Sequence, residues 1–203
     1  MQDASFTVTA SPLEKLQSDA ASWRKSVKAK VVAITGSNGK SVVKEWIAQL
    51  AGNDIKLSRS PRSYNSQVGV PLSLFEISPE SDMALIECGI SRPGEMAILE
   101  SIVSPDAGIF THFADAHDSG FSSRQEKLME KSLLFRNCAF IICREGEYAL
   151  ALRTLLPQSC DIITWGTSST ALYKVSVVEK QPESIHFTVD HVHYTIPFGD
   201  DAS

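Results

Sequence analysis

The chain has 203 residues, 43% of them hydrophobic and 21% charged, which is an ordinary composition for a globular domain. A chain of this length can bury a full core without disulfides or structural metals. Its net charge of −5 at pH 7 argues against a broad nucleic-acid or anionic-membrane surface, so an anionic ligand would need a local binding site.

The first 28 residues are polar and are expected to be a linker or the remnant of a preceding domain, with a short helix over 12–25. No signal peptide is visible at the N-terminus, and no apolar run has the length of a membrane span. The four cysteines show no C-x-x-C spacing, and three of them (Cys88, Cys138 and Cys143) lie in or beside apolar runs. We expect these thiols to pack as small hydrophobes in a protein of the reducing cytoplasm.

From residue 30 onward short apolar runs alternate with helical stretches. Buried strands are predicted at 30–35, 82–87, 106–111, 138–143 and 160–165. Helices are predicted at 92–103, with Pro93 in the first turn, at 123–135 and at 147–156. Another helix follows residue 39 and has an apolar face made of Val42, Val43, Trp46, Ile47 and Leu50. This alternation predicts an α/β fold with a P-loop-type, mainly parallel sheet flanked by helices.

The segment 172–198 changes to the two-residue period of strands. Alternating apolar residues on both sides of Asp190 and His191 predict an antiparallel hairpin, with a further strand before it. The outward positions carry His186, His191 and His193. A metal site is conceivable for the His-x-His pair, but a solvated face of the hairpin is the favoured interpretation.

The stretch "ITGSNGKSVVKEW" (34–46) joins the first predicted strand to the next helix. Backbone N–H groups at such a helix start attract phosphate oxygens, and a lysine and a hydroxyl there suit outer phosphates and Mg²⁺. Ile34 occupies the position at which the general P-loop pattern G-x-x-x-x-G-K-[ST] has its first glycine. The alternative to a phosphate site is a glycine turn with an incidental lysine, which the strand–helix junction disfavours.

Three further residues are candidates by position. Glu87 ends a predicted strand and faces the same edge of the sheet as the loop, where a carboxylate could ligate Mg²⁺. His117 follows the third strand, and Lys131 lies on the next helix. Taken singly, Glu87 could equally be an exposed residue at a strand end, and a surface residue is the default interpretation of His117 and Lys131.

Taken together, these residues resemble the central ATPase domain of the Mur ligases, the ATP-dependent amide-bond-forming enzymes of peptidoglycan synthesis. The resemblance rests on "TGSNGKS" (35–41), "NSQVGVP" (65–71), "ECGISRPGEM" (87–96) and "AHDSGFSSRQEKLMEK" (116–131), and it spans residues 28 to 200. The shorter loop, with Ile34 inside the strand, is the form found in this family. The Glu-x-Gly and Pro-Gly-Glu residues resemble the branch that adds D-alanyl-D-alanine to UDP-N-acetylmuramoyl-tripeptide. The string "RSPRSYNSQVGVPLS" further resembles the version fused to an alanine racemase.

The resemblance implies a role for each matching residue. ATP would be bound by the loop residues Thr35, Gly36, Ser37, Asn38, Gly39, Lys40 and Ser41. Two Mg²⁺ ions would be held by Ser41, Glu87, His117 and Lys131, and Lys131 would be carbamylated to become an anionic oxygen ligand. The catalytic residues would be Lys40, His117 and Lys131. Asn65 would lie near the nucleotide-sugar substrate.

The family's Thr-Asn after the third strand is Thr111-His112 here, and no role is assigned to His112. Residues 29–203 are expected to be the central domain alone, without the N-terminal UDP-sugar domain and the C-terminal domain of the family. Such a domain is expected to bind Mg-ATP weakly and to lack ligase activity by itself. Two alternatives remain open: a domain of a folylpolyglutamate-synthetase-like amide ligase, and a catalytically idle nucleotide-binding module.

Overall fold

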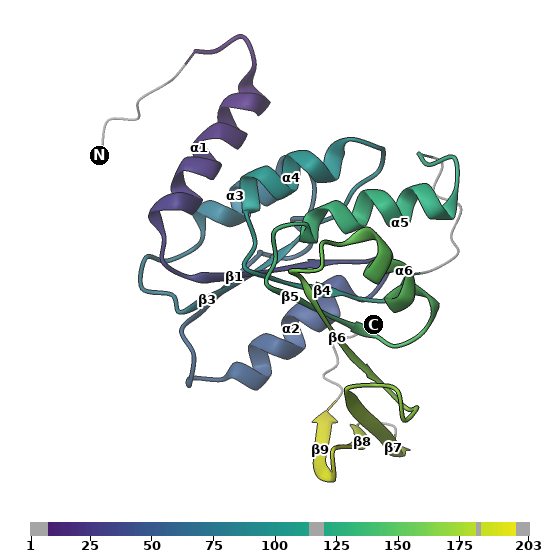
Figure 1. Ribbon diagram of the computed structural model, residues 1–203. Coiled ribbons are helices and arrows are strands. Elements are labelled where there is room, and N and C mark those ends of the chain that lie inside the picture. Colours follow the sequence, from purple (N-terminus) through teal and green to yellow (C-terminus); the bar gives the residue numbers. More distant parts are fainter. Residues whose placement is uncertain (1–7, 114–119, 182–183, 198–203) are drawn as a thin grey trace.

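The structure, a computed structural model, describes residues 8–113, 120–181 and 184–197, and within them the strands form one nine-stranded sheet (Figure 1). Its order is β2-β3-β1-β4-β5-β6-β7-β8-β9. Every pairing from β2 to β7 is parallel, and β7–β8 and β8–β9 are antiparallel. The predicted α/β class, with a mainly parallel sheet and an antiparallel end, is confirmed.

The strands are β1 (Lys30–Thr35), β2 (Leu57–Arg59), β3 (Met83–Glu87), β4 (Ala107–Phe110), β5 (Phe140–Arg144), β6 (Asp161–Gly166), β7 (Tyr173–Gln181), β8 (Ser184–Val189) and β9 (Val192–Pro197). The helices are α1 (Pro12–Ser26), α2 (Lys40–Ala51), α3 (Gly69–Phe75), α4 (Glu95–Val103), α5 (Arg124–Ser132) and α6 (Glu147–Leu155), with a 3₁₀ turn, η1 (Leu133–Phe135), after α5.

The helices cover the two faces of the sheet unequally. Helices α1, α3, α4 and α5 lie on one side, whereas α2 lies on the other (Figure 1). The central strands β1 and β3 are almost entirely buried, as expected of parallel strands with both faces covered. The core gathers large apolar side chains from the sheet and the helices, among them Ile34, Leu74, Leu85, Ile86, Met96, Leu99, Phe135, Ile141 and Leu152.

Helix α1 packs against α3 and α4, which attaches the N-terminal segment to the layer of helices. Arg24 near its end donates hydrogen bonds to the Val103 carbonyl (2.9 Å) and to Asp106 Oδ2 (2.9 Å). These contacts join α1 to the segment between α4 and β4.

Two elements were not predicted, and one helix start was wrong. Strand β2 has only three residues, and α3 has seven with Pro71 in its first turn, so neither has a sustained periodicity. Helix α4 begins at Glu95 because Gly94 caps it in the left-handed region (φ 86°). Pro93 therefore precedes the cap and does not lie in the first turn of the helix.

The C-terminal strands confirm the predicted hairpin. Asp190 and His191 both have positive φ (47° and 73°), which is the backbone of a two-residue turn whose twist suits a hairpin. His186 lies within hydrogen-bond distance of Thr195 Oγ1 (2.9 Å) and of Ser184 Oγ (3.1 Å). His191 and His193 are exposed, which is the environment of a solvated hairpin face.

Candidate functional site

The loop after β1 lies at the carboxyl end of the sheet, where ligands bind in parallel α/β folds. Gly36 has φ 149°, and a Cβ at this position would lie 2.0 Å from Thr111 Oγ1, so only glycine fits. The His112 carbonyl accepts hydrogen bonds from the N–H groups of Ser37 (2.8 Å) and Asn38 (3.4 Å). Thr111 Oγ1 donates to the Asn38 carbonyl (2.7 Å), so the end of β4 fixes the loop.

Helix α2 begins directly after the loop with no side chain capping it. Its N-cap is Gly39 in the left-handed region (φ 83°), and its first turn contains no acidic residue. The first N–H groups of a helix lack partners within the helix, and together with the helix dipole they favour an anion. The start of α2 is therefore suited to phosphate oxygens.

Two lysine side chains converge on one backbone carbonyl of this loop. Lys40 Nζ and Lys131 Nζ each donate a hydrogen bond to the Gly36 carbonyl at 3.1 Å. Lys131 reaches it from α5 and is only 2% exposed. Two ammonium groups held so close to the loop concentrate positive charge where a phosphate chain would lie.

A carboxylate lies beside the first turn of α2. Glu87, at the end of β3 and 1% exposed, accepts a hydrogen bond from Ser41 Oγ at 2.7 Å. Its other oxygen accepts one from Asn65 Nδ2, also at 2.7 Å. The structure thus brings together three residues that the sequence placed far apart. A serine hydroxyl beside a carboxylate is a donor set that suits Mg²⁺.

Two hydroxyls at the loop lack a hydrogen-bond partner in the part of the chain that the structure describes. They are Thr35 Oγ1 and Ser37 Oγ, both buried. Because buried polar groups are nearly always hydrogen-bonded, such atoms at the start of a helix fit a site shaped for a polar ligand. The residues present therefore fit a phosphate chain with its cation.

Sequence reasoning missed Lys44, which is the buried residue of α2. Its Nζ donates hydrogen bonds to the carbonyls of Ser60 (2.8 Å) and Arg62 and lies 3.8 Å from Glu87 Oε2. The prediction assigned the interior side of α2 to its apolar residues, yet Val42 is 39% and Leu50 71% exposed. The sequence signal for Lys44 was its position three residues after Ser41, which places both residues on the same side of the helix.

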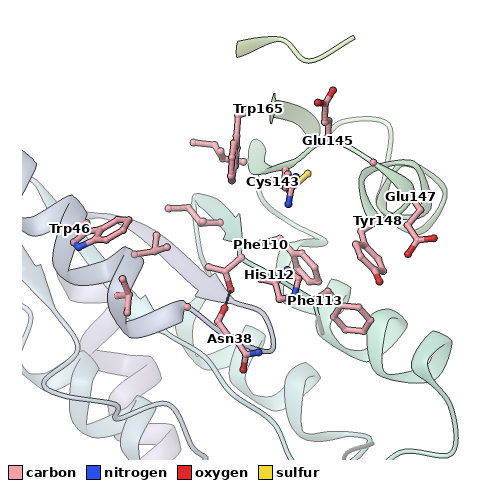
Figure 2. A pocket seen from close by; sticks show the side chains of 18 of the residues that line it. Asn38, Trp46, Phe110, His112, Phe113, Cys143, Glu145, Glu147, Tyr148 and Trp165 are labelled. Carbon is pink, nitrogen blue, oxygen red and sulfur yellow. Dashed lines mark hydrogen bonds between the residues drawn. The ribbon is translucent and has the colours of Figure 1, made fainter. Parts of the chain in front are cut away.

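A pocket of about 1080 Å³ opens beside the loop, bounded by Asn38 and Gly39 at one end. Figure 2 shows Trp46 of α2 on one side and Tyr148 of α6 on the other, with Phe110 and His112 between them. Trp165 of β6 also lines it (Figure 2). The aromatic lining and the volume are those of a site for a flat organic group.

A basic side chain packs against two of the aromatic rings that line this pocket. The Arg124 guanidinium lies 4.7 Å from the ring centre of Tyr148 and 5.8 Å from that of Phe113. His112 contributes its backbone to the loop and its side chain to the pocket lining. The predicted ligand His117 lies outside the residues that the structure describes.

The four cysteines are buried, and burial raises the pKa of each thiol above its ordinary value. Burial, together with the neighbouring Glu87 carboxylate, raises the pKa of the Cys88 thiol. Burial also raises the pKa of Cys143 to about 11. All four thiols are free and buried, which for Cys88, Cys138 and Cys143 confirms the expected packing as small hydrophobes. In the described residues no helix has the length and apolar character needed to cross a membrane.

Comparison with known proteins identifies the family and the fold. The sequence model of the Mur ligase middle domain matches residues 34–199. The UDP-N-acetylmuramoyl-tripeptide–D-alanyl-D-alanine ligase of Bacillus subtilis is 27% identical over 186 residues, which are 90% of this chain and 40% of that relative. The chain thus spans less than half the length of this curated relative.

Solved structures support the same fold. MurF ligase from Thermotoga maritima, crystallised in complex with ADP, superposes with a TM-score of 0.80 at 21% identity and covers 97% of this chain and 47% of its own. A bifunctional folylpolyglutamate synthase/dihydrofolate synthase from Yersinia pestis is more distant, with a TM-score of 0.59 at 15% identity, covering 90% of this chain and 53% of its own.

Proposed function

The chain belongs to the Mur ligase family, whose middle domain it contains, and from this premise we propose that it is the ATP-binding domain of a D-alanyl-D-alanine-adding ligase. The complete reaction joins D-alanyl-D-alanine to UDP-N-acetylmuramoyl-tripeptide in peptidoglycan synthesis, in the cytoplasm. The observation that carries the proposal is the contact between Ser41 and Glu87 beside a glycine loop that also holds Lys40.

The ATP phosphates are proposed to lie along residues 36–41. Lys40 would bind the outer phosphates, and the helix start would receive their oxygens. Ser37 Oγ, buried without a partner in the described structure, would gain one from the ligand. The loop geometry set by Gly36 and Thr111 keeps these groups in place before the ligand arrives.

Mg²⁺ is proposed to be held by Ser41 and Glu87, with a second ion at Lys131 and His117. When bound, Mg²⁺ supplies neutralisation of the charge between phosphates and carboxylate. Carbamylation of Lys131 would turn its ammonium into an anionic oxygen ligand. Lys131 is well placed for this role, since its Nζ already reaches the loop at the Gly36 carbonyl.

The proposed chemistry is activation of the tripeptide carboxylate by ATP, followed by attack of the D-alanyl-D-alanine amine and release of phosphate. The protein mainly positions the reactants and balances charge, because carboxylate and phosphate repel each other. Asn65 is proposed to lie on the substrate side of Glu87, to which its amide donates. Partner domains carried by a longer protein would complete the substrate sites.

The nucleoside end of ATP is proposed to enter the aromatic pocket, because Asn38 and Gly39 belong to both the loop and the pocket. Nucleotide binding should therefore change the fluorescence of Trp46 and Trp165. Replacing both with phenylalanine should abolish the change, whereas Trp23→Phe, on α1, should leave it intact. A change that survives the double replacement would place the nucleoside elsewhere.

The full activity is best tested in a protein that carries this domain together with its partner domains. Phosphate release should require ATP, UDP-N-acetylmuramoyl-tripeptide and D-alanyl-D-alanine together. Release that depends on a folate and glutamate would instead support the folylpolyglutamate-synthetase-like alternative.

One variant distinguishes a ligase domain from a catalytically idle nucleotide-binding module. Lys131→Ala in the same longer protein should cause a severe loss of ligation if this is a ligase domain. Unchanged ligation would contradict the proposed role of Lys131. The 203-residue chain alone is expected to bind Mg-ADP without catalysing ligation.

A further inference from the structure

A lysine is the buried residue of α2, although the helix offers several apolar side chains. The Lys44 side chain is fully buried, with an exposed fraction of 0%. Burying an ammonium group is costly unless its donors are satisfied and its charge is balanced. Such a residue calls for a specific account of what its charge does.

The hydrogen bonds of Lys44 hold the segment between β2 and α3. Its Nζ donates to the carbonyls of Ser60 (2.8 Å) and Arg62. Arg62 has a positive φ of 48°, so the chain turns sharply at the residue whose carbonyl the ammonium binds. Lys44 therefore fixes a turn that the backbone alone would not favour.

That segment carries the groups that surround Glu87. Ser60 Oγ accepts the hydrogen bond of the Glu87 N–H (3.0 Å). Ser63 Oγ lies 3.1 Å from Ser41 Oγ, and Asn65 Nδ2 donates to Glu87 Oε1 (2.7 Å). A shift of residues 60–65 would thus move groups that contact Glu87 directly and one that contacts its partner Ser41.

The charge of Lys44 acts on the same carboxylate. Its Nζ lies 3.8 Å from Glu87 Oε2, the oxygen that also accepts from Ser41, and 3.3 Å from Glu45 Oε1. Because the Glu87 side chain is itself only 1% exposed, these two opposite charges lie together inside the protein. Lys44 touches neither the loop carbonyls that Lys40 and Lys131 bind nor the aromatic pocket.

We propose that Lys44 is a positioning residue that holds Glu87 and the 60–65 segment in the arrangement needed for Mg²⁺-dependent nucleotide binding. This inference rests on the proposed function, because it assigns Lys44 to the cation that accompanies the nucleotide. Residues that orient metal ligands from behind typically change metal affinity by about 10- to 100-fold when replaced. The role differs from that of Lys40, which faces the phosphates.

The test compares ADP affinity with Mg²⁺ and with EDTA in the 203-residue chain. The variant is Lys44→Met, which keeps the aliphatic length and removes the charge. Lys56→Met is the matched control, because Lys56 is 67% exposed and pairs with Glu80 at the surface. Lys44→Arg keeps the positive charge and tests whether that charge restores the effect of Mg²⁺ on ADP affinity. Thermal unfolding of each variant shows whether it is folded.

The expected result is selective. In Lys44→Met the gain in ADP affinity that Mg²⁺ gives should fall about 10-fold or more, or vanish. Affinity in EDTA should stay within about twofold of the unmodified chain, since the phosphate loop is untouched. Lys44→Arg should recover part of the gain, and Lys56→Met should behave as the unmodified chain.

Other outcomes overturn the inference. A folded Lys44→Met variant with an unchanged Mg²⁺ gain, or with equal losses in Mg²⁺ and EDTA, would show that Lys44 has no role toward the cation. If Lys44→Met does not fold, the same measurement is made on Lys44→Gln, which keeps a hydrogen-bond donor. The gain in ADP affinity that Mg²⁺ gives should fall in this variant too. Failure of both to fold would make the role purely structural. If the unmodified chain does not bind ADP at all, the proposed function fails first and this inference with it.

Discussion

The two ends of the parallel sheet differ in how their polar groups are hydrogen-bonded. At the amino end, Asp106 accepts hydrogen bonds from Val31 N–H, Lys30 Nζ and Arg24 Nη2, each at 2.9 Å. At the carboxyl end, Thr35 Oγ1 and Ser37 Oγ are buried without a partner in the described structure. The fully paired Asp106 carboxylate stabilises the fold at the first end, where Trp23 Nε1 of α1 is the one buried side-chain donor left without a partner in the described structure. At the second end the unpaired hydroxyls lie beside two gathered lysines, and this arrangement suits a ligand.

This contrast predicts that variants at the two ends affect nucleotide affinity and the free energy of unfolding to different degrees. Changes at the carboxyl end should weaken nucleotide binding more than they weaken the fold. Changes at the amino end should do the reverse. The largest expected effect is on binding.

Lys40→Met should reduce the affinity for Mg-ADP by about 100-fold, since hydrogen bonds to charged groups contribute about 1.5–3 kcal/mol. The free energy of unfolding should change by less than about 0.5 kcal/mol, because the side chain is partly exposed. Titration calorimetry and chemical denaturation measure the two quantities. Equal losses in both would break the contrast between the ends.

Gly36→Ala should disturb the loop through its Cβ, which would overlap Thr111 Oγ1. A strained backbone at this position should cost about 1–3 kcal/mol of unfolding free energy and also weaken Mg-ADP binding. Gly39→Ala is the matched control, because its Cβ meets nothing within 4 Å and only the positive φ of 83° is strained. If the two variants bind nucleotide equally well, the close approach of the loop to β4 is not needed.

Asp106→Asn should lower the free energy of unfolding by about 1–2 kcal/mol, because the carboxylate charge toward Arg24 and Lys30 is lost. Mg-ADP affinity should not change, since this residue lies at the opposite end of the sheet from the loop. Denaturant unfolding and calorimetry on the same sample check both statements. A weakened nucleotide affinity would show that the two ends are coupled.

The acid stability of the chain should report the same carboxylate. Burial acts to raise the pKa of Asp106, but hydrogen bonds from Val31 N–H and Lys30 and the charge of Arg24 outweigh it and hold the pKa below its usual range. A depressed pKa gives stability that is present above the unfolded value, about 3.9, and is lost as the pH falls through the folded value. As the pH falls below about 4, the unmodified chain should lose stability more steeply than Asp106→Asn. Parallel curves would contradict this.

The alternation of strands and helices in the sequence was enough to predict the parallel sheet, because buried strands and amphipathic helices have distinct periods. The proximity of Ser41 and Glu87 was also predictable, since Glu87 ends β3 and the loop before Ser41 follows β1, and these two strands lie side by side. Strand β2 and helix α3 were not, because three and seven residues are too few to show a period.

The burial of Lys44 was not predictable from residue type, since a lysine on a helix is by default solvated. Its position depends on carbonyls of residues 60 and 62, which a local pattern in α2 cannot reveal. Val42 is exposed for another reason: with Val43, Trp46 and Ile47 it lines the aromatic pocket, so these apolar residues of α2 border a pocket as well as the sheet.

The most direct test of the contrast between the ends is hydrogen–deuterium exchange of the chain with and without Mg-ADP. Protection should be concentrated at residues 36–44 and in the segments lining the pocket. Residues 24–31 and 104–107 at the amino end should exchange as before. Protection absent from residues 36–44, or equally strong at the amino end, would contradict the account.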